Sequence, residues 1–147
     1  MANNTMGGKI VLVTGGTAGI GQVAALELAR QGAKVVIVGR NPEKTARVVD
    51  TLRAASGNPQ IEYLLADLSL KSEVRRLAAE FKQRYDRLDV LLNNAGGYFS
   101  QRQVTTEGLE YTFALNHLNY FLLTTSLLDV LQAAGQARVI NVSSGAH

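Results

Sequence analysis

The 147-residue sequence contains no cysteine, so it forms no disulfide and offers no thiolate to a metal. Its two histidines, His117 and His147, are far apart in the sequence, and no metal site is expected. No apolar run approaches the roughly 18 residues of a membrane span. The first residues also lack the charged-then-apolar pattern of a secretion signal. These absences favour a cytoplasmic protein.

Charge of one sign is not concentrated anywhere in the chain. The net charge is only +3, and basic pairs such as Arg75-Arg76 stand among acidic residues on what should be a solvated helix face. A nucleic-acid surface needs a concentrated basic stripe with exposed aromatics, so that class is disfavoured. Apolar residues make up 46% of the chain, which suffices for a real core. We expect residues 1–147 to form a single domain.

An apolar run over residues 10–14 stops at a group of glycines, and an alanine- and leucine-rich stretch over residues 22–31 follows. This pattern predicts a buried strand, a tight turn and a helix. The first N–H groups of such a helix lack partners and lie at the positive end of its dipole, so the turn is suited to a phosphate. The Gly-Lys-Ser/Thr of a P-loop does not follow, which disfavours that type of site.

Further apolar stretches alternate with helical patterns along the rest of the chain. Strands are expected over residues 33–38, 61–65, 88–92 and 137–142, and helices over residues 41–57, 69–85 and about 106–134, with Asn41 and Ser69 as caps of the first two. Strands without polar alternation, separated by amphipathic helices, predict a parallel sheet covered on both faces. Right-handed crossovers then give the order 3-2-1-4-5, a doubly wound, Rossmann-type α/β fold in three α/β/α layers.

The turn Thr14-Gly15-x-x-x-Gly19-Ile20-Gly21 resembles the cofactor turn of the short-chain dehydrogenase/reductase family. The resemblance covers nearly all of this chain but only the front part of a family member. The Asn-His-Leu run at residues 116–118 and the closing Asn-Val-Ser-Ser-Gly-Ala-His look most like the branch of retinol dehydrogenases and protochlorophyllide reductase. Asn119-Tyr120 departs from the Gly-His that this branch commonly has. The resemblance implies hydride exchange between a nicotinamide and a small carbonyl or alcohol substrate.

The cofactor residues that the sequence and the resemblance together suggest follow the strands. They are Gly15, Thr17, Ala18, Gly19, Ile20, Gly21, Arg40, Asn41, Asp67, Leu68, Asn94, Ala95 and Gly96. Arg40 stands where an NAD-preferring enzyme usually has an acid, and a guanidinium can bind the 2′-phosphate of NADP, so NADP(H) is the favoured cofactor. The alternative is a plain surface arginine. The family's other basic site is Ala18 here.

Two short motifs match family elements that border the cofactor. Asp67-Leu68 matches a pair that contacts the adenine, although simple helix capping explains the same residues. Residues 93–96 match the family's Asn-Asn-Ala-Gly element, which steadies the sheet; a generic turn is the alternative.

Asn116 and Ser144 are the candidate catalytic residues. Asn116 matches the family's asparagine, which is thought to hold a water in a proton relay. A buried amide needs its hydrogen bonds met, and a merely structural asparagine is the alternative. Ser144 rather than Ser143 matches the family's serine, whose hydroxyl would bond the substrate carbonyl oxygen. No Gly-x-Ser-x-Gly elbow surrounds it, which disfavours a hydrolase. Tyr98 and Phe99 are candidate walls of the substrate site.

The family's catalytic tyrosine, with a lysine four residues later, does not occur in this sequence. The residues four places after the five tyrosines are Asp67, Asp89, Arg102, Leu115 and Thr124. In the family this pair follows the serine and carries the proton transfer. We therefore expect a chain truncated after its fifth strand, nearly inert alone, with that strand as an exposed edge. A non-catalytic NADP(H)-binding module or sensor and an interaction protein with a decayed site are the alternatives. The resemblance also allows a homo-oligomer.

Overall fold

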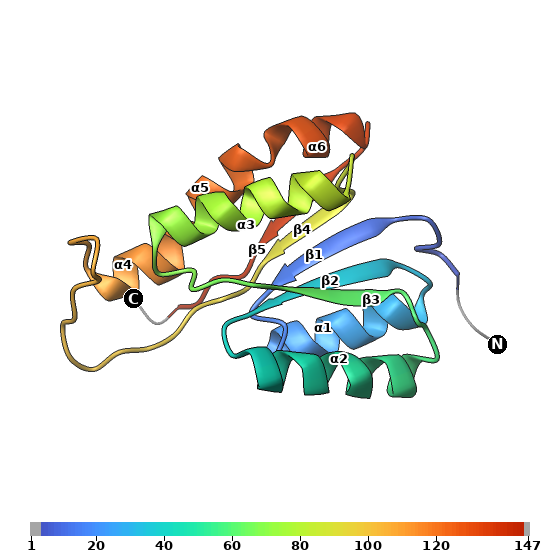
Figure 1. Cartoon of the computed structure of the whole chain (residues 1–147), viewed down its shortest axis with the longest axis horizontal. Helices are drawn as coiled ribbons and strands as arrows, with labels where there is room; N and C mark the ends of the chain where they lie inside the picture. Colours follow the sequence, from blue (N-terminus) through green and yellow to red (C-terminus); the bar gives the residue numbers. More distant parts are fainter. Residues whose placement is uncertain (1–3, 146–147) are drawn as a thin grey trace.

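The computed structural model describes residues 4–145, which form a five-stranded parallel sheet in the order β3-β2-β1-β4-β5 (Figure 1). The strands are β1 (Ile10–Thr14), β2 (Lys34–Gly39), β3 (Ile61–Leu65), β4 (Val90–Asn93) and β5 (Arg138–Asn141). This order confirms the prediction, and the reversal between β1 and β4 creates the switch point beyond which ligands bind in such sheets.

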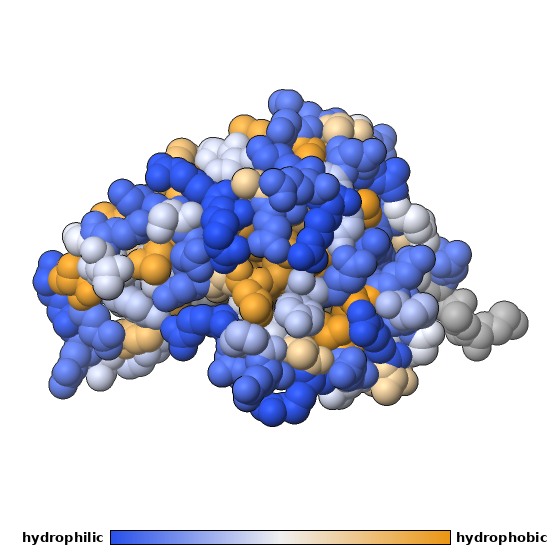
Figure 2. All heavy atoms as spheres, viewed as in Figure 1, coloured by the Kyte–Doolittle hydropathy of each residue, from blue (hydrophilic) through white to orange (hydrophobic). Residues whose placement is uncertain are grey.

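Helices cover both faces of the sheet, as predicted. They are α1 (Gly19–Arg30), α2 (Pro42–Ser56), α3 (Lys71–Arg84), α4 (Tyr111–Phe113), the π-helical segment η1 (Ala114–Leu118), α5 (Asn119–Ser126) and α6 (Leu128–Ala133). Figure 1 shows α1 and α2 on one face and α3, α5 and α6 on the other. Val11 and Val13 pack toward the first layer and Leu12 toward the second, so β1 shows no polar alternation. Polar side chains dominate the surface in Figure 2, with apolar atoms in the band occupied by the edge strand β3.

The two predicted helix caps have different outcomes. Asn41 caps α2 as expected, because its side-chain oxygen accepts a hydrogen bond from the Lys44 N–H at 2.9 Å. The prediction for Ser69 is wrong, since its hydroxyl donates to Asp67 instead. The first N–H groups of α3, at Lys71 and Ser72, donate to the carboxylate of Glu107, which reaches them from a loop 36 and 35 residues away in sequence.

The prediction of one helix from residue 106 to residue 134 is also wrong. Residues 105–108 form a turn with Gly108 at φ +82°, and Val104 and Glu110 pair in an antiparallel bridge. Glu110 then caps a helix that begins at Tyr111, five residues later than expected. Continuous helical structure ends at Leu127, whose φ and ψ of −107° and 7° separate α5 from α6.

The strand β5 lies at the edge of the sheet and is poorly covered. All four of its residues are exposed, and Val139 and Ile140 retain 41% and 47% of their accessible surface. This confirms the expected exposed edge. In the part of the chain that the structure describes, no helix combines the length and apolar character needed to cross a bilayer.

Candidate functional site

The carboxyl ends of β4 and β5 border an open cleft of about 1350 Å³. Helical residues from α4 to α5 form its other side. Five sequence-predicted site residues line this cleft, together with both expected wall residues: Ile20, Asn94, Gly96, Asn116, Ser144, Tyr98 and Phe99. The predicted catalytic pair, Asn116 and Ser144, is therefore brought to one cavity from segments that are far apart in the sequence.

The glycine turn presents an open helix terminus at the end of β1. Ala18, the N-cap of α1, has extended backbone and makes no side-chain capping bond, and the first helical turn carries no acid. Gly19 has φ +54°, and a Cβ built on it would meet no atom within 4 Å. On Gly21 a Cβ would lie 2.3 Å from the Gly15 carbonyl oxygen. Gly21 is thus required for packing, whereas Gly19 leaves the N-terminus of α1 accessible to an anion.

The end of β4 is tied to this turn by Asn94. Its Nδ2 donates to the carbonyl oxygens of Thr14 and Gly15, both at 3.2 Å. The buried hydroxyl of Thr14 in turn accepts the N–H groups of Asn94 and Ala95 at 2.9 and 3.0 Å. Thr14 thus holds the end of β4 at the candidate site, a role that the sequence alone did not predict. Its signal was a hydroxyl at the last position of an apolar strand, directly before the glycines.

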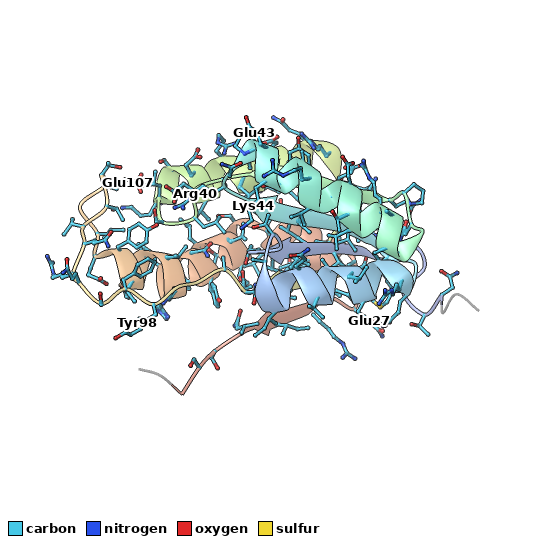
Figure 3. All side chains as sticks on the ribbon, turned by 90° about the horizontal axis from the view of Figure 1, so that it is seen from below. Glu27, Arg40, Glu43, Lys44, Tyr98 and Glu107 are labelled. Carbon is cyan, nitrogen blue, oxygen red and sulfur yellow. The ribbon has the colours of Figure 1, made fainter. Side chains whose placement is uncertain are left out.

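Arg40 lies directly after β2, at the amino-terminal end of α2 (Figure 3). Its guanidinium is exposed and donates to the hydroxyl of Tyr111 at 3.4 Å. Thr17 lies against the end of β2, because a Cβ on Gly39 would come within 2.8 Å of the Thr17 methyl group. The side-chain oxygen of Asn41 is already committed to capping α2. Arg40 therefore supplies a positive charge at the end of β2, where the turn meets that strand.

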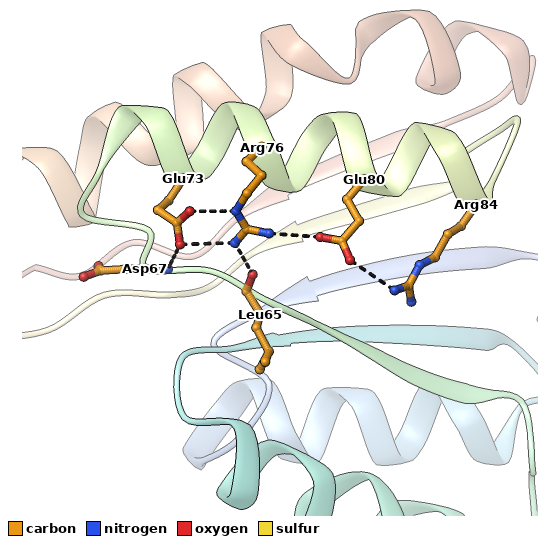
Figure 4. A network of polar contacts seen from close by, with 6 residues as sticks. All are labelled: Leu65, Asp67, Glu73, Arg76, Glu80 and Arg84. Carbon is orange, nitrogen blue, oxygen red and sulfur yellow. Dashed lines mark hydrogen bonds and ion pairs between the residues drawn. The ribbon is translucent and has the colours of Figure 1, made fainter.

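The Asp67-Leu68 pair follows β3 as predicted, but its two side chains point to different environments. Asp67 Oδ1 accepts the hydroxyl and N–H of Ser69 at 2.6 and 3.1 Å. Leu68 is 6% exposed and belongs to the core, so it can offer a ligand only its backbone. Figure 4 shows the Asp67 carboxylate turned away from the ion-pair network on α3, which consists of Glu73, Arg76, Glu80 and Arg84.

That network joins α3 to the end of β3. The Arg76 guanidinium donates to the Leu65 carbonyl oxygen at 2.6 Å and to both Glu73 and Glu80 (Figure 4). The hydrogen bond from Arg76 also holds the pKa of Glu73 below its ordinary value. The Glu73 carboxyl therefore stays ionised at neutral pH, and the hydrogen bond from Arg76 to Leu65 fixes the backbone just before Asp67.

Asn116 lies in the π-helical segment and is half-buried rather than buried. Its Oδ1 accepts the Gly97 N–H at 2.9 Å, and its Nδ2 donates to the Gly97 carbonyl oxygen at 2.7 Å. The deeply buried amide of this helix is Asn119, which is 1% exposed and whose Oδ1 has no hydrogen-bond partner among the described residues. Asn119, rather than Asn116, is thus the buried amide for which an unmet hydrogen bond is costly. π-helical segments often mark functional sites, and Asn116 anchors the start of the loop that borders the cleft.

The serines after β5 are both exposed and both line the cleft, so the choice of Ser144 over Ser143 stays a prediction. Asn141 fixes the end of β5, because its Oδ1 accepts a hydrogen bond from Asn93 Nδ2 at 2.9 Å. The same Asn93 amide donates to Thr124 Oγ1 on α5 at 3.1 Å. Ala146 and His147, which end the serine motif, lie outside the described residues.

His117 stands on the exposed side of the helix. Its ring centroid lies 5.4 Å from that of Phe113, and the two rings are tilted by 32°. Within residues 4–145 the His, Asp and Glu side chains form no group of three that could hold a metal ion. The imidazole of His117 packs against the Phe113 ring at the edge of the cleft.

A sequence model of the short chain dehydrogenase family matches residues 9–147. The chain belongs to the short chain dehydrogenase family. It is 40% identical to human retinol dehydrogenase 13 over 143 residues, covering 97% of this chain and 43% of that protein. It is 41% identical to human polyprenol dehydrogenase, covering 95% and 43%. Pseudomonas aeruginosa RhlG, in an active-site complex with NADP, superposes with a TM-score of 0.83 at 35% identity, covering 98% of this chain and 57% of that one.

These comparisons confirm the expected family and fold. The chain spans less than half the length of the two human dehydrogenases. Within this member of the short chain dehydrogenase family the candidate residues form two groups, the cleft residues and the strand-end residues that include Gly19, Arg40 and Asp67. Asn94 joins the groups, since it lines the cleft and also holds the Gly15 carbonyl oxygen. The roles of the individual residues stay predictions.

Proposed function

We propose that the chain binds NADP(H) along the carboxyl ends of β1, β2 and β4. It thereby supplies the nucleotide site of an oxidoreductase that transfers hydride between nicotinamide and a carbonyl or alcohol. The observation that carries the proposal is the pairing of an uncapped helix terminus at Gly19 with an exposed guanidinium at Arg40. The NADP complex of the similar Pseudomonas protein and the dehydrogenase names of the human relatives support it.

The residues present fit a phosphorylated dinucleotide. The N-terminus of α1 offers backbone N–H donors and the positive end of a helix dipole, and the open space at Gly19 lets a diphosphate approach them. At the end of β2 the residue after Gly39 is Arg40 rather than an acid. A carboxylate there would repel a 2′-phosphate, whereas a guanidinium can bind it through two charge-assisted hydrogen bonds.

When bound, the nicotinamide would supply or accept the hydride. The chain's own residues would bind and orient the reactants. Asn94 holds the glycine turn against β4, and Asn116 holds Gly97 at the edge of the cleft. In this proposal the Ser144 hydroxyl donates a hydrogen bond to the substrate carbonyl oxygen and orients it. A small carbonyl or alcohol compound would occupy the cleft beside Tyr98 and Phe99.

A second candidate function is NADP(H) binding without turnover, as in a sensor. The observation that favours it is that no tyrosine in the sequence is followed four places later by a lysine. Both candidates require saturable NADPH binding by these 147 residues. They differ in turnover, which a panel of carbonyl compounds measures as NADPH oxidation at 340 nm. We propose that these residues bind the dinucleotide and oxidise it slowly or not at all.

Calorimetric titration with NADPH and with NADH tests the proposal. We expect NADPH to bind more tightly, and Arg40→Ala to weaken NADPH binding by about 10-fold or more, because hydrogen bonds to charged groups contribute about 1.5–3 kcal/mol. NADH binding should change little. Arg30→Ala is the control, since Arg30 pairs with Glu27 at the opposite end of α1. Equal binding of the two cofactors by the wild-type chain, or no binding at all, contradicts the proposal.

A further inference from the structure

The Tyr111 hydroxyl is the hydrogen-bond acceptor that the Arg40 guanidinium contacts, across 71 residues of sequence. We propose that Tyr111 is a positioning residue that holds Arg40 ready for the 2′-phosphate, so that selectivity for NADP(H) depends on the Tyr111 hydroxyl. This inference rests on the proposed function and adds a residue from α4 to it. Neither the glycine turn nor the strand ends contain Tyr111.

The chemistry of a guanidinium makes such an acceptor useful. An exposed arginine loses side-chain entropy when it is fixed, and that loss weakens binding of any anion it must hold. Arg40 is exposed and follows the last residue of β2. Its Nη1 donates to the Tyr111 hydroxyl at 3.4 Å. Because guanidinium has five donors, the bond to Tyr111 leaves enough of them for the forked arrangement that a phosphate accepts.

Tyr111 is itself held from several sides, which allows it to restrict Arg40. Its backbone N–H donates to the Gln103 carbonyl oxygen at 2.9 Å, and it is the first residue of a helix capped by the Glu110 carboxylate. Its ring meets the ring of Phe99 edge-on, with centroids 4.7 Å apart and an interplanar angle of 79°. The phenol therefore has a fixed position at the amino-terminal end of the helix that also carries Asn116.

The same contacts join the cofactor and substrate sides of the site. Phe99 lines the cleft, and its ring packs against the phenol that contacts Arg40. The loop between β4 and α4 thus contributes Phe99 to the cleft, and the first residue of α4, Tyr111, contacts Arg40 on the cofactor side. A change in that loop is expected to alter cofactor selectivity as well as the shape of the cleft.

Titrations of Tyr111→Phe with NADPH and NADH test the inference. This variant keeps the ring contact with Phe99 and removes only the hydroxyl. We expect the Kd for NADPH to rise about 3- to 10-fold, as for loss of one ordinary hydrogen bond, while the Kd for NADH changes less than about twofold. In an Arg40→Ala background the same change should add less than about twofold, because the hydroxyl acts through Arg40. Tyr63→Phe, on β3, is the matched control.

The outcomes separate this inference from the proposed function. If Arg40→Ala loses NADPH selectivity but Tyr111→Phe does not, the positioning role is wrong and the proposed function stands. An equal loss for NADPH and NADH in Tyr111→Phe indicates a merely structural role and also overturns the inference. If Tyr111→Phe raises the Kd for NADPH as much in the Arg40→Ala background as in the wild-type chain, the inference is also overturned. If the wild-type chain fails to bind NADPH, both proposals fail.

Discussion

The strands β2 and β5 differ strongly in how much of their surface is buried. β2 is buried at every position after its first residue, between α1 and α2 on one face and α3 on the other, whereas all four residues of β5 are exposed. The turn at Gly19 lies in the β2 half of the molecule, and the cleft lies in the β5 half. The proposed nucleotide site is therefore built on a packed scaffold, whereas the proposed substrate site lies beside an exposed edge strand.

In the open half, polar contacts between distant segments fix β5 and the cleft, in addition to the apolar packing of α5 and α6 against α3 and the sheet. The Asn93 amide joins β4 to Asn141 and to Thr124 of α5, and the Glu107 carboxylate joins the loop after β4 to the start of α3. Such bonds fix geometry at a small net gain in free energy, because each replaces bonds to water. Truncations in β2 should therefore cost more stability than truncations in β5.

Substituting one isoleucine in each half should give the largest difference in the free energy of unfolding. Ile37→Ala, at a residue of β2 with no accessible surface, should lower the free energy of unfolding by about 2–5 kcal/mol. Ile140→Ala, at a residue of β5 that is 47% exposed, should cost less than about 1 kcal/mol. Urea denaturation of the two variants measures both values. Equal losses would mean that β5 is covered in solution.

Alanine substitutions at two glycines distinguish an effect on stability from an effect on the proposed NADPH binding. Gly19 and Gly57 have φ of +54° and +70°, and a Cβ on either would meet no atom within 4 Å. Replacement by alanine should therefore cost a similar amount of stability at both, about 1–2 kcal/mol of backbone strain. Only Gly19→Ala should weaken NADPH binding, by about 10-fold or more, because its methyl group would occupy the phosphate approach. Unchanged NADPH affinity in Gly19→Ala would remove the turn from the site.

The smallest expected effect concerns Glu107 in the open half. Burial alone would raise the pKa of this carboxyl group, but hydrogen bonds from Ser72 and Lys71 outweigh burial, so its pKa lies below the usual 4.5. A lowered folded-state pKa stabilises the protein fully above the unfolded value, and this contribution is lost as the pH falls through the folded value. Glu107→Gln should thus lower Tm by roughly 2–5 °C near pH 7, with the gap closing below about pH 4.5.

The control for Glu107 is Glu43→Gln in the first turn of α2. That helix already has a side-chain cap from Asn41, so the loss of charge at Glu43 should change Tm less. A Tm gap for Glu107→Gln that persists to pH 3 would show that the carboxylate charge does not act on α3. Tm measured between pH 3 and pH 7 decides between these results.

The packed half was predictable because its signals are local. The bounds of β3, Ile61–Leu65, agree with the prediction at both ends, since an apolar run lies there between turn residues. The start of α2 also follows from neighbouring residues, namely the Asn41 side chain and Pro42 in the first turn. The expected family residues Asn94, Gly15 and Gly21 lie where the turn and β4 meet.

The open half was predicted less well because long-range contacts determine it. Glu107, Leu109 and Glu110 favour a helix, yet Glu107 bonds to α3 and Gly108 adopts φ +82°, so the chain forms a turn there. The Ser69 cap failed for the same reason, since a carboxylate from a distant loop occupies the place of the cap. The contact of Arg40 with Tyr111 also joins residues that no local pattern connects. Periodicity and capping rules do not register such pairs.

A crystal structure of the chain with saturating NADPH tests the central claim most directly. We expect the diphosphate to accept hydrogen bonds from the backbone N–H groups at the start of α1, beside Gly19, and the 2′-phosphate to lie within hydrogen-bond distance of the Arg40 guanidinium. A dinucleotide bound away from these two positions, or no dinucleotide at saturating concentration, would contradict the account.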